Sequence, residues 1–266
     1  MQRRFRLGTT SFIYPDHILP NVQKIGRFFD EIELLIFESQ PAGVLPSGRQ
    51  IAELAVLSRD LGVFYNIHLP TDVSLTHDLA AERQKAADVI ARVVELCAPL
   101  DPSTHTLHLE MATDREKPDD LSAWQERAVD GLNRLLPRIA SPRNLSVETL
   151  DYAPACLTPL VAAHDLSVCL DIGHHLKHGF DLTHSVRMFE DRLAMIHLHG
   201  VAGDGPGARD HAGLEHLDKV QRRQVMDLLK GYAGCVSLEV FNRENLNRSL
   251  TVLSQVFDDI PLPLPG

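Results

Sequence analysis

Carboxylate and histidine residues recur in this chain directly after short apolar runs. In CLDIGHHLKHGFD, residues 169–181, Asp171 and His174 follow such a run and are separated by Ile172 and Gly173. Carboxylate oxygens and imidazole nitrogens together suit Zn²⁺, and also Mn²⁺ or Fe²⁺. If these side chains are metal ligands, matching donors should lie at the ends of other strands.

Six apolar runs carry such a donor at their carboxyl ends. The donors are His68, His108, Glu148, Asp171, His197 and Glu239. Each has apolar or nearly apolar neighbours, as His197 has Ile196 and Leu198, so period-two alternation sends the neighbours outward and the donor inward. Buried carboxylates need a compensating cation. The pattern therefore predicts a divalent metal centre where these strands end.

Further candidate ligands lie in loops. Gly173 lets the chain turn at once after Asp171, so that His174 can reach the same site. In the long loop after the seventh run, Asp210 or His211 of the RDH sequence can add another ligand.

Candidate substrate contacts surround these ligands. Thr10, Ser11 and Tyr14 lie at the end of the first run or just after it, where hydroxyl groups can bind an oxyanion. Glu38 ends the second run. His199 lies two residues after the seventh donor, on the same strand face, so it is either a substrate contact or a residue without a role in the site.

The elements that position these residues alternate regularly along the chain. Strand-like runs occur at 3–10, 31–38, 63–69, 105–110, 144–150, 166–173, 193–200 and 235–241. Amphipathic helices are predicted between them, for example over 47–62, 82–97 and 242–257. Eight β/α units favour a single-domain (β/α)8 TIM barrel over residues 1–266, with loops 111–120 and 200–216 framing the site. A doubly wound sheet is the competing fold, but no G-x-G-x-x-G follows the first run.

Composition narrows the class of partner. The 266 residues contain 26 basic and 36 acidic side chains, a net charge of −10. This balance argues against a protein that binds duplex nucleic acid or an anionic membrane mainly by electrostatics, and favours a small-molecule substrate. Four cysteines without a C-x-x-C pair, and no apolar signal or membrane span, lead us to expect a cytoplasmic protein. The oligomeric state is left open.

The donor pattern resembles the xylose isomerase-like barrels and, more closely, their apurinic endonuclease family 2 branch. The resemblance covers nearly the whole chain and implies up to three zinc ions. The residues that fit the family's ligands are His68, His108, Glu148, Asp171, His174, His197 and Glu239. Glu148 corresponds to the metal-bridging carboxylate. The endonucleases carry Asp-x-His where Asp210 and His211 are adjacent here, so two or three zinc ions are expected, with manganese as an alternative.

A closer resemblance is to the cobamide-remodelling phosphodiesterases of this superfamily. It is carried by LGTTSFIYPDHILPNV, IELLIFES, VETLDY, CLDIGHHL, IHLHG with RDH, and LEVF. It implies metal-dependent hydrolysis of the phosphodiester that links the lower-ligand nucleoside to the corrinoid, giving cobinamide phosphate and an α-riboside. Glu148 and Glu239 would then be catalytic, with Glu239 serving as a ligand or as the base that orients water.

Two other functions are compatible with a barrel of this kind. A sugar isomerase or epimerase would need one divalent metal, for which Glu148, Asp171, His197 and Glu239 suffice. In that chemistry His68, His108 and His174 have no obvious role, which counts against it. A barrel that binds a ligand without turnover would be expected to lack part of the ligand set.

Overall fold

Eight parallel strands close into a barrel. The computed structural model describes residues 1–39, 44–111, 120–203, 205–261 and 264. The barrel order is β1-β10-β7-β6-β5-β4-β3-β2. The strands are β1 (Arg6–Thr10), β2 (Glu31–Leu35), β3 (Phe64–His68), β4 (His105–Leu107), β5 (Leu145–Glu148), β6 (Ser167–Asp171), β7 (Leu193–Leu198) and β10 (Cys235–Leu238). The predicted (β/α)8 TIM barrel is confirmed.

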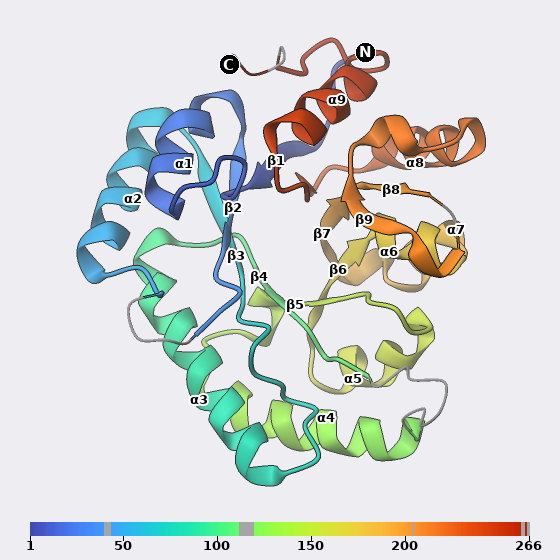
Figure 1. Ribbon diagram of the computed structural model, residues 1–266. Coiled ribbons are helices and arrows are strands. Elements are labelled where there is room, and N and C mark those ends of the chain that lie inside the picture. Colours follow the sequence, from blue (N-terminus) through green and yellow to red (C-terminus); the bar gives the residue numbers. More distant parts are fainter. Residues whose placement is uncertain (40–43, 112–119, 204, 262–263, 265–266) are drawn as a thin grey trace.

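Helices surround the barrel (Figure 1). They are α1 (Ile18–Ile25), α2 (Gly48–Leu61), α3 (Ala80–Cys97), α4 (Leu121–Leu135), α5 (Thr158–Ala163), α6 (Ile172–His178), α7 (Leu182–Met188), α8 (Lys219–Gly231) and α9 (Arg243–Ser254). None of the helices in the described part of the chain has the length and apolarity needed to cross a membrane.

Helix α2 shows how local sequence sets these boundaries. The Ser47 side chain accepts a hydrogen bond from the Gln50 N–H, and the Gln50 side chain accepts one from the Ser47 N–H. This reciprocal cap satisfies two backbone donors that the first turn leaves without partners. Gly62 ends the helix with φ 69°, a left-handed conformation that favours glycine. The helix predicted over 47–62 is confirmed.

Side chains alternate between two environments along the strands. Leu170, Ile196 and Val236 belong to the main apolar core, which lies between the strands and the helices. Cys169 and Met195, one residue earlier on β6 and β7, form a separate small cluster with Cys235. Because strand side chains alternate in direction, this small cluster fills the barrel interior.

The loop predicted over 200–216 contains regular structure. Strands β8 (Gly200–Ala202) and β9 (Arg209–Ala212) pair antiparallel, and 3₁₀ turns cover Gly205–Gly207 and Leu214–His216. A Cβ on Gly200 would lie 2.1 Å from the Gly213 carbonyl oxygen, so the hairpin closes only around glycine here. Most of the other predicted loop, 111–120, lies outside the described residues.

Candidate metal centre

Four side chains, three from strand ends and one from the residue after β10, meet at the carboxyl end of the barrel. Glu148, Asp171, His197 and Glu239 each offer a ligand atom, and these atoms lie within 4.8 Å of one another. His197 Nδ1 lies 3.2 Å from Glu239 Oε2 and 3.4 Å from Glu148 Oε1. Asp171 and His197 are register partners on β6 and β7, which puts them at one level. The structure brings together these four predicted residues.

A buried carboxylate behind His197 determines which nitrogen faces this group. His197 Nε2 lies 2.9 Å from Glu33 Oε1, and Ser237 Oγ–H donates to Glu33 Oε2 at 2.7 Å. The hydrogen bond keeps a proton on Nε2, so Nδ1 is the nitrogen that faces the other carboxylates. Burial would raise the pKa of Glu33, but the charge of His197 lowers it. Glu33 is thus held as an anion against His197.

The sequence pattern predicts Glu38 as a substrate contact at the end of the second run and gives no role to Glu33. Strand β2 ends at Leu35 rather than at residue 38, and Glu38 is exposed. The boundary prediction was therefore wrong. Glu33 lies between Ile32 and Leu34, the same apolar flanking that marked the six donors, so its alternation was the available signal.

A second group lies beside the first and shares Glu148. His108 Nε2 is 3.0 Å from Glu148 Oε2, and His68 Nε2 is 3.5 Å from the same oxygen. His68 Nδ1 lies 3.0 Å from the Leu69 carbonyl, to which it can donate, leaving its Nε2 lone pair directed at the group. The two oxygens of Glu148 therefore face different groups, as expected for a bridging carboxylate.

A third set of donors lies around the start of α6. Asp171 caps this helix, accepting the His174 N–H at 2.6 Å, and His174 Nε2 lies 3.9 Å from Asp171 Oδ2. His199 Nε2 lies 3.3 Å from Asp171 Oδ1. His211 Nδ1 lies 3.6 Å from Glu239 Oε2. His174 and His211 thus fall where they were expected, and His199 joins them.

Asp210 and the predicted hydroxyl contacts lie differently. Asp210 pairs with Lys177 at 2.7 Å and belongs to none of the candidate ligand groups among the described residues. Thr10 Oγ1–H donates to the Val240 carbonyl at 2.8 Å. Ser11 Oγ accepts the Leu35 N–H at 3.0 Å, and the Tyr14 ring lies under the Lys24 ammonium. The Thr10 and Ser11 hydroxyl groups thus bind backbone groups in this structure, and the roles of all three residues as substrate contacts stay predictions.

The electrostatics of the site depend on charge attraction between imidazoles and carboxylates. Burial would raise the pKa of Glu148, but His197 and His108 hold it well below its usual range. Burial would lower the pKa of His199, but the Asp171 carboxylate raises it to about 9. The ionised carboxylates are the form that binds metal.

Unpartnered polar atoms show that the site fits metal ions. Asp171 Oδ2, His197 Nδ1, His199 Nε2 and Glu239 Oε2 are buried and have no hydrogen-bond partner within the described structure. Each such atom costs about 1–3 kcal/mol when left unsatisfied. All four are metal-ligating atom types, and all four residues belong to the candidate ligand groups.

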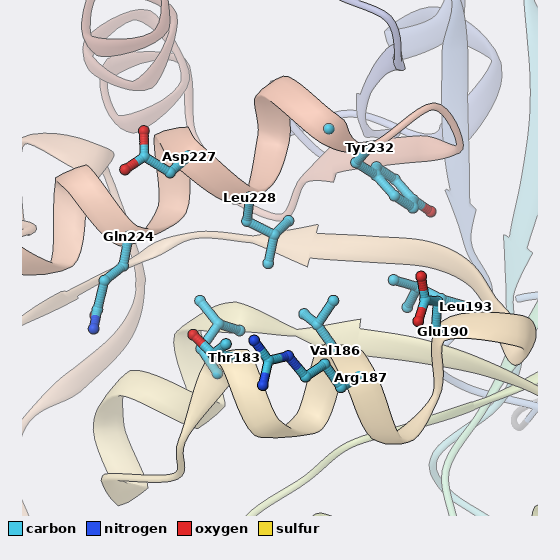
Figure 2. A pocket seen from close by; sticks show the side chains of 11 residues that line it. Thr183, Val186, Arg187, Glu190, Leu193, Gln224, Asp227, Leu228 and Tyr232 are labelled. Carbon is cyan, nitrogen blue, oxygen red and sulfur yellow. The ribbon is translucent and has the colours of Figure 1, made fainter.

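Two other features are poorer candidates for the functional site. Cys169 lies near Glu148 and His197, but burial raises its thiol pKa and keeps it protonated. A cavity of about 530 Å³ opens between α7 and α8, lined by apolar side chains such as Val186 and Leu228 and by charged ones such as Arg187 and Asp227 (Figure 2). Its lining includes none of the candidate ligands, so we place the functional site at the barrel mouth.

The closed barrel and its histidine–carboxylate groups define a TIM barrel with a candidate metal centre. The chain belongs to the xylose isomerase-like TIM barrel family, whose match spans residues 19–256. No protein of curated function matches the chain.

Solved structures with this fold include enzymes of two kinds. A D-tagatose 3-epimerase-like protein is 17% identical, with a TM-score of 0.75 over 94% of this chain and 96% of that chain. The 3-keto-D-glucoside 4-epimerase from E. coli is 16% identical, with a TM-score of 0.70 over 94% and 98%. Endonuclease IV from Thermus thermophilus is 18% identical, with a TM-score of 0.69 over 94% and 100%. At these identities the likeness shows the fold.

Proposed function

We propose that this protein is a metal-dependent phosphodiesterase that acts on a small molecule, with cobamides as its substrates. The observation that supports this most strongly is the placement of Glu148. One of its oxygens faces His197 and the other faces His68 and His108. A carboxylate shared by two ligand groups is suited to a pair of ions, and an ion pair suits displacement at phosphorus.

The metal centre supplies charge neutralisation of the phosphoryl oxygens and activation of water when ions are bound, with zinc as the expected metal. Glu148, Asp171, His197 and Glu239 would hold the central ion, and His68, His108 and Glu148 the second. Glu33 accepts a hydrogen bond from the His197 Nε2–H and so keeps the His197 ring oriented. Glu239 Oε2 has no hydrogen-bond partner in the described structure, so it can serve as a ligand or accept a proton from water.

Aromatic side chains support a substrate with an apolar part. Phe37 packs edge-on against His68 with ring centroids 4.7 Å apart, and Phe241 lies 4.6 Å from His211. The ring centroids of the two phenylalanines are 6.1 Å apart. They form an apolar wall beside the candidate ligands, against which a nucleobase or ring can stack. The net charge of −10 and the sequence likeness to cobamide-remodelling enzymes favour a cytoplasmic small-molecule substrate over nucleic acid or membrane.

Product analysis tests this function. The zinc-loaded protein is incubated with cobalamin beside a chelator-treated sample, and products are identified by mass spectrometry. We expect zinc-dependent formation of cobinamide phosphate and an α-riboside, nearly lost in His68→Ala and retained in His184→Ala, whose side chain is exposed. Unchanged cobalamin in the zinc-loaded sample would contradict the substrate assignment.

A second candidate is a sugar epimerase with one divalent metal. It is favoured by the central group, which already supplies four ligands, and by the epimerases among the similar folds. One metal ion per chain, epimerisation of ketoses, and full activity in His68→Ala and His108→Ala would support it. Two or more ions per chain, together with no turnover of ketoses, would reject it.

A further inference from the structure

We propose that His199 completes a third metal site with His174, His211 and the Asp171 carboxylate, and that Asp210 is not a ligand. This inference rests on the proposed function, for which two or three ions are expected, and it names the residues that would hold the third ion. It assigns a ligand role to a histidine that the sequence left between substrate contact and a residue without function.

The three imidazoles converge at one place. The His199 ring centroid lies 4.3 Å from that of His211 and 5.8 Å from that of His174. His199 shares one group of closely spaced ligand atoms with Asp171 and His174. It shares another with His211 and Glu239. It is therefore the residue that joins the two groups.

The orientation of His199 suits ligation by Nε2. Its Nδ1 lies 3.0 Å from the Gly200 carbonyl and accepts the His211 N–H at 3.0 Å, so Nε2 is the nitrogen that faces Asp171. The side chain is fully buried, and its Nε2 has no hydrogen-bond partner in the described structure. A histidine with a purely structural role would bury this polar atom at a cost, whereas a ligand uses it.

The chain makes room for this ring at Gly173. A Cβ on Gly173 would lie 1.9 Å from His199 Cε1, a distance that no side chain can occupy. The glycine of DIGHH is therefore required by the position of the imidazole as well as by the turn after Asp171.

Asp210 has an ion-pair partner outside this set. Its Oδ2 lies 2.7 Å from Lys177 Nζ, which ties β9 to α6. His211, the next residue, has φ 52° and lies with its Nδ1 3.1 Å from the Glu239 carbonyl. This left-handed conformation is unusual for a residue with a side chain and is sustained by the surrounding contacts. It places adjacent side chains in different environments, so the departure from Asp-x-His does not remove the third site.

The composition of this set predicts how it behaves. Its three imidazoles are neutral when they bind metal, and Asp171 is shared with the central group. A third divalent cation would thus leave the mouth with a larger positive charge, which favours an anionic phosphodiester.

Metal counting tests the third site without substrate. Purified protein is equilibrated with zinc, exchanged into metal-free buffer, and measured by elemental mass spectrometry, with zinc-edge anomalous diffraction to locate the ions. We expect three ions in the wild type, two in His199→Gln, and three in the matched control Asp210→Asn. Circular dichroism and thermal melting check the fold of each variant.

Gly173→Ala is the second variant, because it substitutes none of the ligand residues and favours the helix, while its added Cβ would displace the His199 ring. We expect Gly173→Ala to lose the same ion. If His199→Gln and Gly173→Ala do not fold, His174→Ala replaces them, and it is also expected to bind two ions. Two ions in the wild type, three in folded His199→Gln, or a loss in Asp210→Asn would overturn the inference. Three ions in a protein that leaves cobalamin intact would reject the proposed substrate but keep this site.

Discussion

The two ends of the barrel treat buried carboxylates differently. At the amino end, Glu31 is fully buried and has Arg6 as its counter-ion, with 3.2 Å between Arg6 Nε and Glu31 Oε2. Asn66 donates to Glu31 Oε1 at 2.8 Å, and Ser103 donates to the same oxygen. Within the described residues, the ion-pair partners of Glu148, Asp171 and Glu239 at the carboxyl end are histidines throughout.

This difference separates a structural carboxylate from candidate ligands. A guanidinium is permanently charged, so Arg6 compensates Glu31 without an added cation. An imidazole can instead give up its proton and bind metal through the freed lone pair. The same fold thus compensates one buried carboxylate with its own cation and surrounds three others with groups that can exchange a proton for a metal ion.

The comparison is sharpest for matched substitutions of Glu148 and Glu31. Glu148→Gln keeps the side-chain shape but removes the charge that both ligand groups share. We expect a loss in kcat/KM of about 10³-fold or more, and loss of bound zinc. Steady-state kinetics on cobalamin and metal analysis measure these effects. Glu31→Gln is the control and should retain its zinc, so equal zinc loss in both variants would contradict the distinction.

Glu33 allows the comparison within one strand. Glu33→Gln removes the charge behind His197 while leaving an oxygen that can accept its Nε2–H. We expect zinc affinity to fall roughly 10–100-fold, as for other residues that orient a ligand. Competition with a chromophoric chelator measures it. Glu31→Gln, two residues earlier on β2, should leave the affinity unchanged, and unchanged affinity in Glu33→Gln itself would show that His197 needs no such support.

The fold could be predicted because the β/α alternation is local and repeated. Ser47 and Gly62, for example, mark the two ends of α2 in the sequence as they do in the structure. Strand ends were less accurate, since pairing with neighbours determines where a strand stops. Strand β4 ends at Leu107, so His108 lies one residue beyond it and still reaches Glu148.

The site was predictable where strand alternation decides direction, and not where contacts between distant segments do. Glu148, Asp171 and His197 follow from alternation alone. The separation of Asp210 from His211 depends on Lys177 and on the β8–β9 hairpin, which have no local signal. The position of His199 likewise depends on the space left by Gly173, which only the tertiary structure shows.

At the amino end, Glu31→Gln should affect stability instead of metal binding. The variant loses its ion pair with Arg6, and this pair is discounted because Arg6 is 40% exposed. We expect the free energy of unfolding to fall by about 1–2 kcal/mol in urea titrations. Glu244→Gln, in an exposed pair with Arg248, should change it by an amount too small to resolve in the same titrations. A stability loss of that small size in Glu31→Gln would remove the structural role of this carboxylate.

A smaller effect is expected in the pH dependence of zinc affinity at the carboxyl end. Burial would lower the pKa of His108 and His199, but Glu148 raises that of His108, and Asp171 raises that of His199 to about 9. Below that pH the proton on His199 competes with zinc, so affinity should rise from pH 6 to 8 by about tenfold per unit for each displaced proton.

In the chelator-treated protein the stability of the fold also depends on pH, and it should fall as the pH rises. A pKa raised from 6.5 to about 9 means that the His199–Asp171 attraction stabilises the fold fully below pH 6.5 and is lost as the pH rises through 9. Thermal melting should therefore show stability falling with pH in chelator, and a smaller fall or a rise when zinc is bound. Parallel slopes in the two conditions would mean that zinc and this proton do not compete for the same imidazole.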